Sequence, residues 1–445
     1  MYEDVPPSAT PVPMTASPLP IRRLGFWMCL ALVMGNMIGS GVFLLPAALA
    51  PFGWDAVLGW ILTIGGALCL AFVFSRMAQA FPRAGGPVGQ VGLAFGRLPE
   101  FAIGWCYWVS IWTANVTIAV AAVSYLSLFA PGIGTMPGLP ALLAIGLIWA
   151  VTLVNLRGAR TAGAFQLVTL IAKLIPLAVV ATIITLVLAR SGTAALAPFP
   201  PGGFTASGVT ASAALTLWAL LGFESAAIAC DKADRPSVTV PRATMAGTLL
   251  TGLIYLFICS GIALLLPAEI AAGSDAPFAL FVSRYWSPGP ALFIGLFAAI
   301  SAIGALNGWI LMQGEVPLAM ARTGTLPPWL GVTGANGTPV RALLVSSALA
   351  SLLVIANSAR SMSNLFEFMA LLSTSAALWL YLAAAAAALK LRVAIPVALL
   401  GMGYALWTLW GAGPGASGLS LLLMAAGLPL YWWTRRGQGA SVSKA

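Results

Sequence analysis

Histidine is absent from the 445 residues, and only 7% of them are charged. Any response to pH must therefore come from a carboxylate or a lysine rather than from an imidazole. The 11 acidic residues place no two carboxylates on one face of a predicted helix, and no nucleophile lies beside a recognisable base. These absences argue against an enzyme.

Cysteine is also scarce, with five residues and no Cys-x-x-Cys pair. All five lie within or at the ends of apolar runs, so the sequence predicts neither a disulfide framework nor a metal site. No cofactor is expected. The glycine-rich segment 85–89 has no strand before it, and we expect a flexible connection there rather than a phosphate cradle.

Apolar residues, in contrast, make up 60% of the chain, and the mean hydropathy is +0.98. This composition predicts an all-α polytopic membrane protein. A window of about 20 apolar residues per span defines about twelve transmembrane helices. They cover residues 25–50, 54–78, 99–128, 139–155, 163–189, 209–230, 244–267, 288–317, 342–357, 363–388, 393–410 and 417–434.

Positive charge, with a formal net value of +10, is unevenly divided between the loops. Loops on one side of the spans carry 17 Lys and Arg residues, whereas those on the other side carry only Arg190, Arg284 and Arg360. The positive-inside rule then places both termini in the cytoplasm. Residues 1–23 and 435–445 are expected to be cytoplasmic tails, the first of them disordered. The same pattern argues against a nucleic acid as partner.

Three glycines interrupt the first span, at residues 35, 39 and 41. Glycine costs about 1 kcal/mol relative to alanine inside a helix, and unwound backbone in a bilayer is tolerated only where it lines a protected or watery cavity. The freed N–H groups before the second half-helix would form an anion pocket, to which Ser40 adds a hydroxyl. The alternative is a packing face of the Gly-x-x-x-Gly type, from Gly35 to Gly39.

The sixth span has a similar interruption, where Gly222 adjoins the intramembrane acid Glu224. Breaks in spans one and six, five spans apart, predict two inverted repeats of five helices with discontinuous first and sixth helices, the architecture of many secondary transporters. The first repeat would cover 24–200 and the second 201–390. Residues 391–434 would form two accessory helices.

Ionisable residues at membrane depth are costly unless they are paired or functional. Glu224 is the strongest candidate for proton coupling, with a protonated carboxyl that bridges two helices as the alternative. Lys173 could release its proton when buried, or be a fixed cation that holds the first break. Glu315 is a weaker candidate at a helix end, and Arg360 and Glu367 are expected to be solvated at the outer mouth.

Uncharged polar and aromatic residues supply further candidates. Asn36 and Asn115 could contact a ligand or bond a neighbouring helix. Most of the 16 tryptophans belong in interfacial belts. Trp218, beside the second break, and Trp309, next to small residues, could instead offer indole faces to an organic cation, although packing explains them equally well.

These segments resemble those of a known family. Gly35-Asn36 through Gly39-Ser40-Gly41-Val42-Phe43 resembles the first-helix motif of the amino acid-polyamine-organocation (APC) superfamily, and Gly222-Phe223-Glu224-Ser225-Ala226 its sixth-helix motif. Tyr107-Trp108 with Trp112 and Asn115, and Gly308-Trp309, are similar to its third and eighth helices. The likeness runs from about residue 24 to 390 and is strongest to the basic amino acid/polyamine antiporters, in particular those that exchange arginine for agmatine.

The resemblance implies alternating access without sodium, and a possible homodimer through the last two helices. It implies a substrate carboxylate at Ser40 and the Gly41 amide, and a substrate side chain that runs over Trp309 to Asn115. It also implies gating by Trp218, and pH sensitivity from Glu224 with Tyr107. The residues expected to contact substrate are Asn36, Met37, Ser40, Gly41, Ser110, Ile111, Asn115, Trp218, Leu221, Trp309 and Ser375.

Some positions depart from the arginine/agmatine pattern. Ile111, Ile118 and Ala219 make the pocket more apolar, and Ala383 stands where a tyrosine is expected, two residues after Tyr381. Lys173 is the largest departure, because proton-coupled amino acid transporters of the superfamily carry a lysine in this region. The leading hypothesis is thus an antiporter that exchanges a basic amino acid, arginine, for its decarboxylated amine, agmatine. The alternatives are a proton-coupled symporter of neutral amino acids that uses Lys173, and a passive channel.

Overall fold

The computed structural model describes residues 25–39, 41–82, 84, 86–224, 236–334 and 337–434. Within these ranges the regular elements are helices, and no strand occurs. The predicted tails, Ser40 and the whole segment 225–235 that follows the second break lie outside the described residues.

Each of the twelve predicted spans has a helical counterpart. Eight helices are long and apolar enough to cross a bilayer, and four shorter apolar helices accompany them in the described ranges. Helix α1, the first half of the interrupted first span, is added to these twelve. The membrane helices are α1 (Phe26–Met37), α2 (Gly41–Leu49), α3 (Trp54–Ala80), α5 (Arg97–Leu126), α7 (Leu139–Leu156), α8 (Ala159–Ser191), α9 (Ala206–Leu220), α11 (Pro236–Leu265), α14 (Pro288–Arg322), α15 (Val340–Ala356), α16 (Met362–Lys390), α17 (Ile395–Gly411) and α18 (Gly413–Ala426). The all-α membrane fold is confirmed.

Short helices fill the connections. They are α4 (Gly86–Phe95), α6 (Gly132–Thr135), α12 (Ala268–Ala272) and α13 (Pro277–Tyr285), with short 3₁₀ turns between others. The expectation of a flexible connection at the glycine-rich segment is wrong for its described part, because α4 begins at Gly86. Gly86 adopts φ +85°, a conformation that glycine reaches without steric cost.

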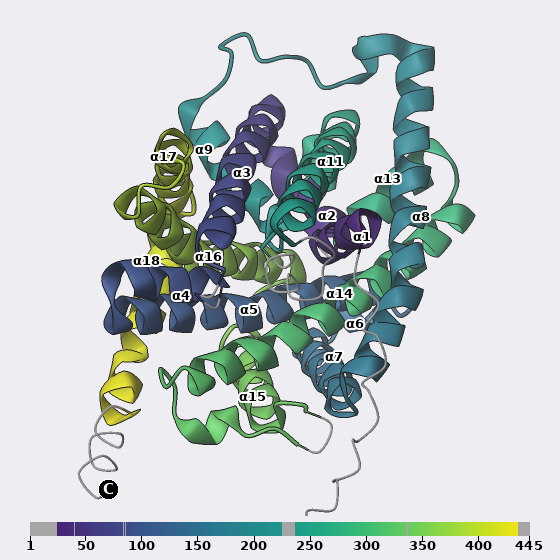
Figure 1. Cartoon of the computed structure of the whole chain (residues 1–445). Coiled ribbons are helices and arrows are strands. Elements are labelled where there is room, and N and C mark those ends of the chain that lie inside the picture. The colour runs from purple at the N-terminus through teal and green to yellow at the C-terminus, as the bar shows by residue number, and fades with distance from the viewer. Residues whose placement is uncertain are drawn as a thin grey trace, which may run out of the picture.

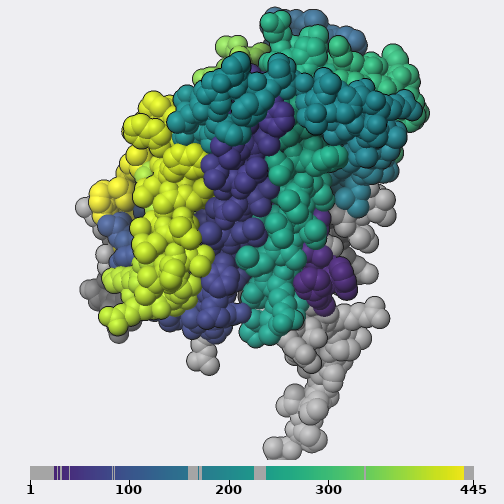
Figure 2. Space-filling model, turned by 90° about the horizontal axis from the view of Figure 1, so that it is seen from above, coloured from purple at the N-terminus to yellow at the C-terminus, as the bar shows by residue number. Residues whose placement is uncertain are grey.

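Helix α5 runs through the middle of the bundle and packs against α14 and α16 (Figure 1). Nearly all of its side chains from Phe101 to Tyr125 are buried. On one lateral face, α17, α3 and α11 lie side by side, with α1 beside α11 (Figure 2). Large apolar side chains such as Phe293, Leu400 and Trp410 are exposed on the outside, as a lipid-facing surface requires.

Contacts between helix ends define the two ends of the bundle. Gln79 of α3 donates from Nε2 to the Ser237 carbonyl of α11, and the Lys390 Nζ of α16 lies 5.0 Å from the centre of the Phe95 ring of α4. We call this the basic end. Its described positive residues are Arg76, Arg97, Arg157, Arg242, Arg322, Arg341, Lys390 and Arg392. The opposite end carries Arg190, Arg284 and Arg360.

Candidate functional site

The two interrupted helices meet at their breaks. Helix α1 ends at Met37, and α2 begins at Gly41, where an added Cβ would lie 3.2 Å from the Trp218 Nε1 of α9. Gly222, with φ +107°, follows the end of α9, and a Cβ there would lie 3.5 Å from the Asn36 carbonyl oxygen. The glycines therefore permit each broken helix to approach the backbone of the other.

The break in α1 leaves carbonyl groups without helical partners, because a helix cannot satisfy its last four carbonyls internally. Two side chains from other helices supply donors. The Lys173 Nζ of α8 donates to the Gly35 carbonyl at 2.8 Å, and the Tyr255 hydroxyl of α11 donates to the Met37 carbonyl at 2.9 Å. Lys173 is completely buried, and its positive charge lies at the carbonyl end of α1, where a cation is favoured.

At the break after α9, the side chain that bonds the backbone is a carboxylate instead. Glu224 Oε1 accepts from the Tyr107 hydroxyl at 2.9 Å. Oε2 accepts from the Tyr381 hydroxyl at 3.0 Å and from the Gly222 amide at 3.1 Å. The predicted pairing of Tyr107 with Glu224 is thus present as a contact, and Tyr381 supplies the phenol that was expected two positions later on the same helix.

Two indole rings flank the joined breaks. Trp218 is in the last turn of α9, and Trp309 is one turn beyond Ala305 of α14, whose Cβ lies 3.0 Å from the position of a Cβ added to Gly39. Both rings are about 95% buried. The Trp218 Nε1 has no hydrogen-bond partner in the part of the chain that the structure describes, so it can donate to a ligand.

Asn115 belongs to a series of hydrogen-bonded polar side chains that crosses from α5 to α15. Its Nδ2 donates to the Gln313 Oε1 of α14 at 2.7 Å, and the Gln313 Nε2 donates to the Ser347 hydroxyl at 2.8 Å. With this orientation, the Asn115 Oδ1 is buried and has no hydrogen-bond partner within the described ranges. Gln313 was missed in the sequence. Its signal was a neutral amide at membrane depth, four residues after Trp309 and therefore on the same helix face.

Ser375 does not fit the role expected from the sequence. Its hydroxyl faces Ser417 of α18 at 3.5 Å, whereas Ser373 donates to the Ser110 carbonyl of α5 at 2.8 Å. Two residues correspond to about 200° around a helix, so only one of the two serines can face α5. The contact with the Ser110 carbonyl is therefore made by Ser373, and a role of Ser375 in substrate binding stays a prediction. Ile111, next to Ser110, is completely buried.

A family model described as amino acid permease matches residues 24–436. The chain belongs to the amino acid permease family. The resemblance to the APC superfamily and its basic amino acid/polyamine antiporters is confirmed, and this membership supports a transporter rather than an enzyme.

Curated relatives of this permease carry more specific names. The cadaverine/lysine antiporter of Escherichia coli (strain K12) is 34% identical over 345 residues, which cover 76% of each chain. The putrescine transporter PotE of the same strain is 30% identical over 427 residues, 92% of this chain and 95% of the relative. PotE of Haemophilus influenzae is 29% identical over 425 residues, 92% of this chain and 96% of the relative.

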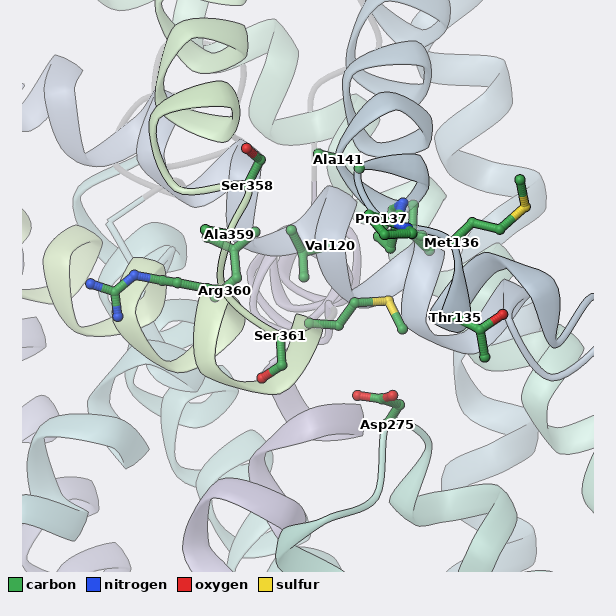
Figure 3. A pocket seen from close by; sticks show the side chains of 16 residues that line it. Val120, Thr135, Met136, Pro137, Ala141, Asp275, Ser358, Ala359, Arg360 and Ser361 are labelled. Atoms are coloured by element: carbon green, nitrogen blue, oxygen red, sulfur yellow. The ribbon is translucent and has the colours of Figure 1, made fainter.

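The other charged residues that the sequence offered as candidates lie away from the breaks, and so does one cavity. A cavity of about 330 Å³ occurs at the end opposite the basic end, between α5, α6 and the start of α16 (Figure 3). Asp275 faces into it, and the Arg360 side chain points away, with its guanidinium 4.2 Å from the centre of the Phe368 ring. Glu315 is exposed on the surface of α14, and Glu367 is half-buried. The helix breaks therefore form the candidate substrate site.

Proposed function

We propose that this permease is a sodium-independent antiporter that exchanges a basic amino acid for its decarboxylated amine by alternating access. One observation carries the proposal: both helix breaks meet at a buried point, and the Trp218 Nε1 beside them has no hydrogen-bond partner in the described chain, as is also true of Asn115 Oδ1 on α5. Unpaired polar groups in lipid-buried positions are costly, and a polar substrate would satisfy them. The names of the curated relatives support the same class of substrate. We place the protein in a bacterial inner membrane, with the basic end toward the cytoplasm.

The proposed substrate pose follows from the charges of the two breaks. The substrate carboxylate lies at the start of α2, against the Gly41 amide, where the helix terminus favours an anion. The α-ammonium lies against the backbone carbonyls between Trp218 and Leu221 and against the Met37 carbonyl. The Met37 carbonyl oxygen keeps one lone pair after it accepts from the Tyr255 hydroxyl. Asn36 and Ser40 adjoin this point in the sequence.

The substrate side chain then runs past Trp309 toward Asn115, beside Ile111 and the Ser110 backbone. A terminal ammonium carries three donors and a guanidinium five. Because Asn115 Oδ1 is a single acceptor in apolar surroundings, the pocket suits the ammonium better. Lysine and cadaverine are therefore our first substrate pair, and arginine and agmatine, which the family resemblance favours, are the second.

Two groups are assigned to gating. Trp218 closes over the bound substrate from the end of α9. Glu224, held by Tyr107 and Tyr381, couples the closure to protons, since its protonation would turn one carboxylate oxygen into an O–H donor and weaken the bonds that the phenols donate to it.

The test is uptake of labelled lysine and labelled arginine into proteoliposomes that contain cadaverine, agmatine or no amine. Exchange requires uptake into amine-loaded vesicles only, and lysine uptake should exceed arginine uptake when cadaverine is inside. The reverse order would assign arginine and agmatine instead. The matched control is the Asn115→Leu variant, for which we expect the preference between the two amino acids to diminish.

A second candidate function is proton-coupled symport of a neutral amino acid. It is favoured by Lys173, which is buried on the Gly35 carbonyl and forms no ion pair with any described residue. A buried lysine without an anion releases its proton readily. Alanine uptake into empty vesicles, driven by an external acid pulse and lost in Lys173→Met, would establish this candidate and exclude obligate exchange.

A further inference from the structure

A cavity of about 380 Å³ opens at the basic end and extends inward to Glu224. Its walls come from α3, α4 and the first turns of α11, and Phe223 and Glu224 lie at its inner end. The residues that line it are Phe74, Ser75, Ala78, Gln79, Phe81, Pro82, Gly86, Pro87, Gln90, Phe223, Glu224, Ser237, Val240, Pro241 and Thr244. Neither tryptophan of the substrate site, nor Met37 or Gly41, belongs to this lining.

The cavity is lined by polar groups that water would satisfy by hydrogen bonding. Gln90 of α4 is 2% exposed, and its Oε1 has no hydrogen-bond partner among the described residues. A buried acceptor without a donor costs about 1–3 kcal/mol, and ordered water commonly satisfies such groups. Glu224, at the inner end, still has lone pairs beyond those that accept from Tyr107, Tyr381 and Gly222. Water in the cavity could thus reach both Gln90 and Glu224.

Aromatic side chains pack together at the inner end of the cavity. Phe74, Phe223 and Tyr381 pack against one another with ring centres 5.1–5.8 Å apart. An amino acid would need to displace these rings, whereas a proton can pass along water to the carboxylate. The described lining thus contains neither indole of the substrate site and no residue of the first break, and it reaches the second break at Glu224.

Few titratable groups face Glu224 from its neighbouring helices. Tyr107 comes from α5 and Tyr381 from α16, and Tyr404 of α17 lies beyond Tyr381. The described lining from α3, α4 and α11 contains no charged side chain, because Arg76 and Arg242 of these helices are not part of it. Among the described residues of the lining, Glu224 is the group that can change its protonation near neutral pH.

We propose that this cavity is an aqueous route by which protons from the basic-end compartment reach Glu224 without using the substrate path. The inference rests on the coupling role that we proposed for Glu224. It means that the pH on the basic side sets the protonation of Glu224 even while the substrate site is closed. Transport would then respond to that pH independently of the substrate gradient.

The first test is the accessibility of single cysteines in a cysteine-free variant that retains transport. Ser75→Cys lines the cavity, and Ala71→Cys, one turn deeper on the same helix face, is completely buried and outside the lining. A charged, membrane-impermeant methanethiosulfonate added on the basic side should modify Ser75→Cys at least about tenfold faster than Ala71→Cys, since thiol reactivity follows access. Equal rates, or faster modification from the other side, would overturn the route, whether or not the protein exchanges amines.

The second test blocks the cavity in the otherwise native protein. Ala78→Phe adds a ring to the lining, and Ala80→Phe, two residues further on and outside this lining, is the control. In proteoliposomes with the two pH values set separately, Ala78→Phe should keep the half-saturating lysine concentration and lose the response to basic-side pH. A normal response in Ala78→Phe would overturn the proposal. If Glu224→Gln keeps the wild-type pH profile while Ser75→Cys is modified, Glu224 has no coupling role and the proton route fails with it.

Discussion

The two helix breaks differ in the charge of the side chain that bonds the backbone at each of them. At the first, α1 presents carbonyl groups, and a buried cation, Lys173, binds one of them. At the second, Gly222 presents an N–H, and a buried anion, Glu224, accepts it together with two phenols. The two breaks thus present different backbone groups to their buried side chains, a carbonyl to a donor at the first and an N–H to an acceptor at the second.

The two breaks also differ in the number of hydrogen bonds that each charged side chain forms. Among the described residues, Lys173 has one acceptor, whereas Glu224 has three donors. Removal of one partner should therefore damage the first break more than the second. The variants below test that asymmetry and are ordered from the largest expected effect to the smallest.

The largest effect is expected from Lys173→Met, which keeps the length of the side chain and removes its charge. The Gly35 carbonyl would be left without its donor, at a cost of about 1–3 kcal/mol, and exchange should fall to background. Transport and thermal unfolding of the purified variant measure this. Leu174→Met, at a half-exposed neighbouring position, is the control, and an active Lys173→Met would remove Lys173 from the first break.

Trp309→Leu comes next, because it removes the ring beside the first break and leaves the second intact. We expect substrate affinity to fall about tenfold, which equals about 1.4 kcal/mol and lies within the range for cation–aromatic contacts. Calorimetric titration of the purified variant with lysine measures it. Trp410→Leu, at a ring 83% exposed on α17, should bind normally; equal affinities would place Trp309 in packing alone.

Glu224→Gln should alter pH dependence more than binding. The amide keeps the shape and cannot exchange a proton, so the transport rate should become nearly independent of pH. Uptake measured across a pH series gives the profile. An unaltered profile would make Glu224 a structural group.

Tyr381→Phe removes one of the three donors to Glu224 and should reduce exchange only about fivefold, the equivalent of a hydrogen bond worth about 1 kcal/mol. Tyr107→Phe is the matched comparison, since its phenol binds the other carboxylate oxygen. Initial rates of exchange measure both variants. A complete loss of exchange in either variant would mean that the second break tolerates the loss of one hydrogen bond no better than the first.

Ser373→Ala and Ser375→Ala should show the smallest effect. Ser373 bonds the Ser110 carbonyl beside the site, and Ser375 faces α18, so only Ser373→Ala should change the half-saturating substrate concentration, by about two- to fivefold. Kinetics of lysine uptake distinguish them. A change in Ser375→Ala alone would restore the original expectation.

Most of the scaffold was predictable from local patterns. The apolar runs located all twelve spans, and the glycines at 35, 39 and 222 located both breaks. Helix α4 was missed because its glycines and Pro87 indicate a loop, although the segment packs against α5 and α16. Local propensity is a weak guide where tertiary packing decides. The boundaries of the two repeats and the cytoplasmic location of the termini stay predictions.

The sequence alone determined that this chain is a membrane protein with broken helices and buried charges, because these features depend on hydrophobic runs, glycines and single residues within one span. Only the tertiary structure decided which groups those charges meet. Tyr381 lies 157 residues from Glu224, and Lys173 lies 138 residues from Gly35. Each contact depends on the rotation of one helix against another, which a one-dimensional pattern does not contain, and the same holds for Gln313 at Asn115 and Ser373 at Ser110.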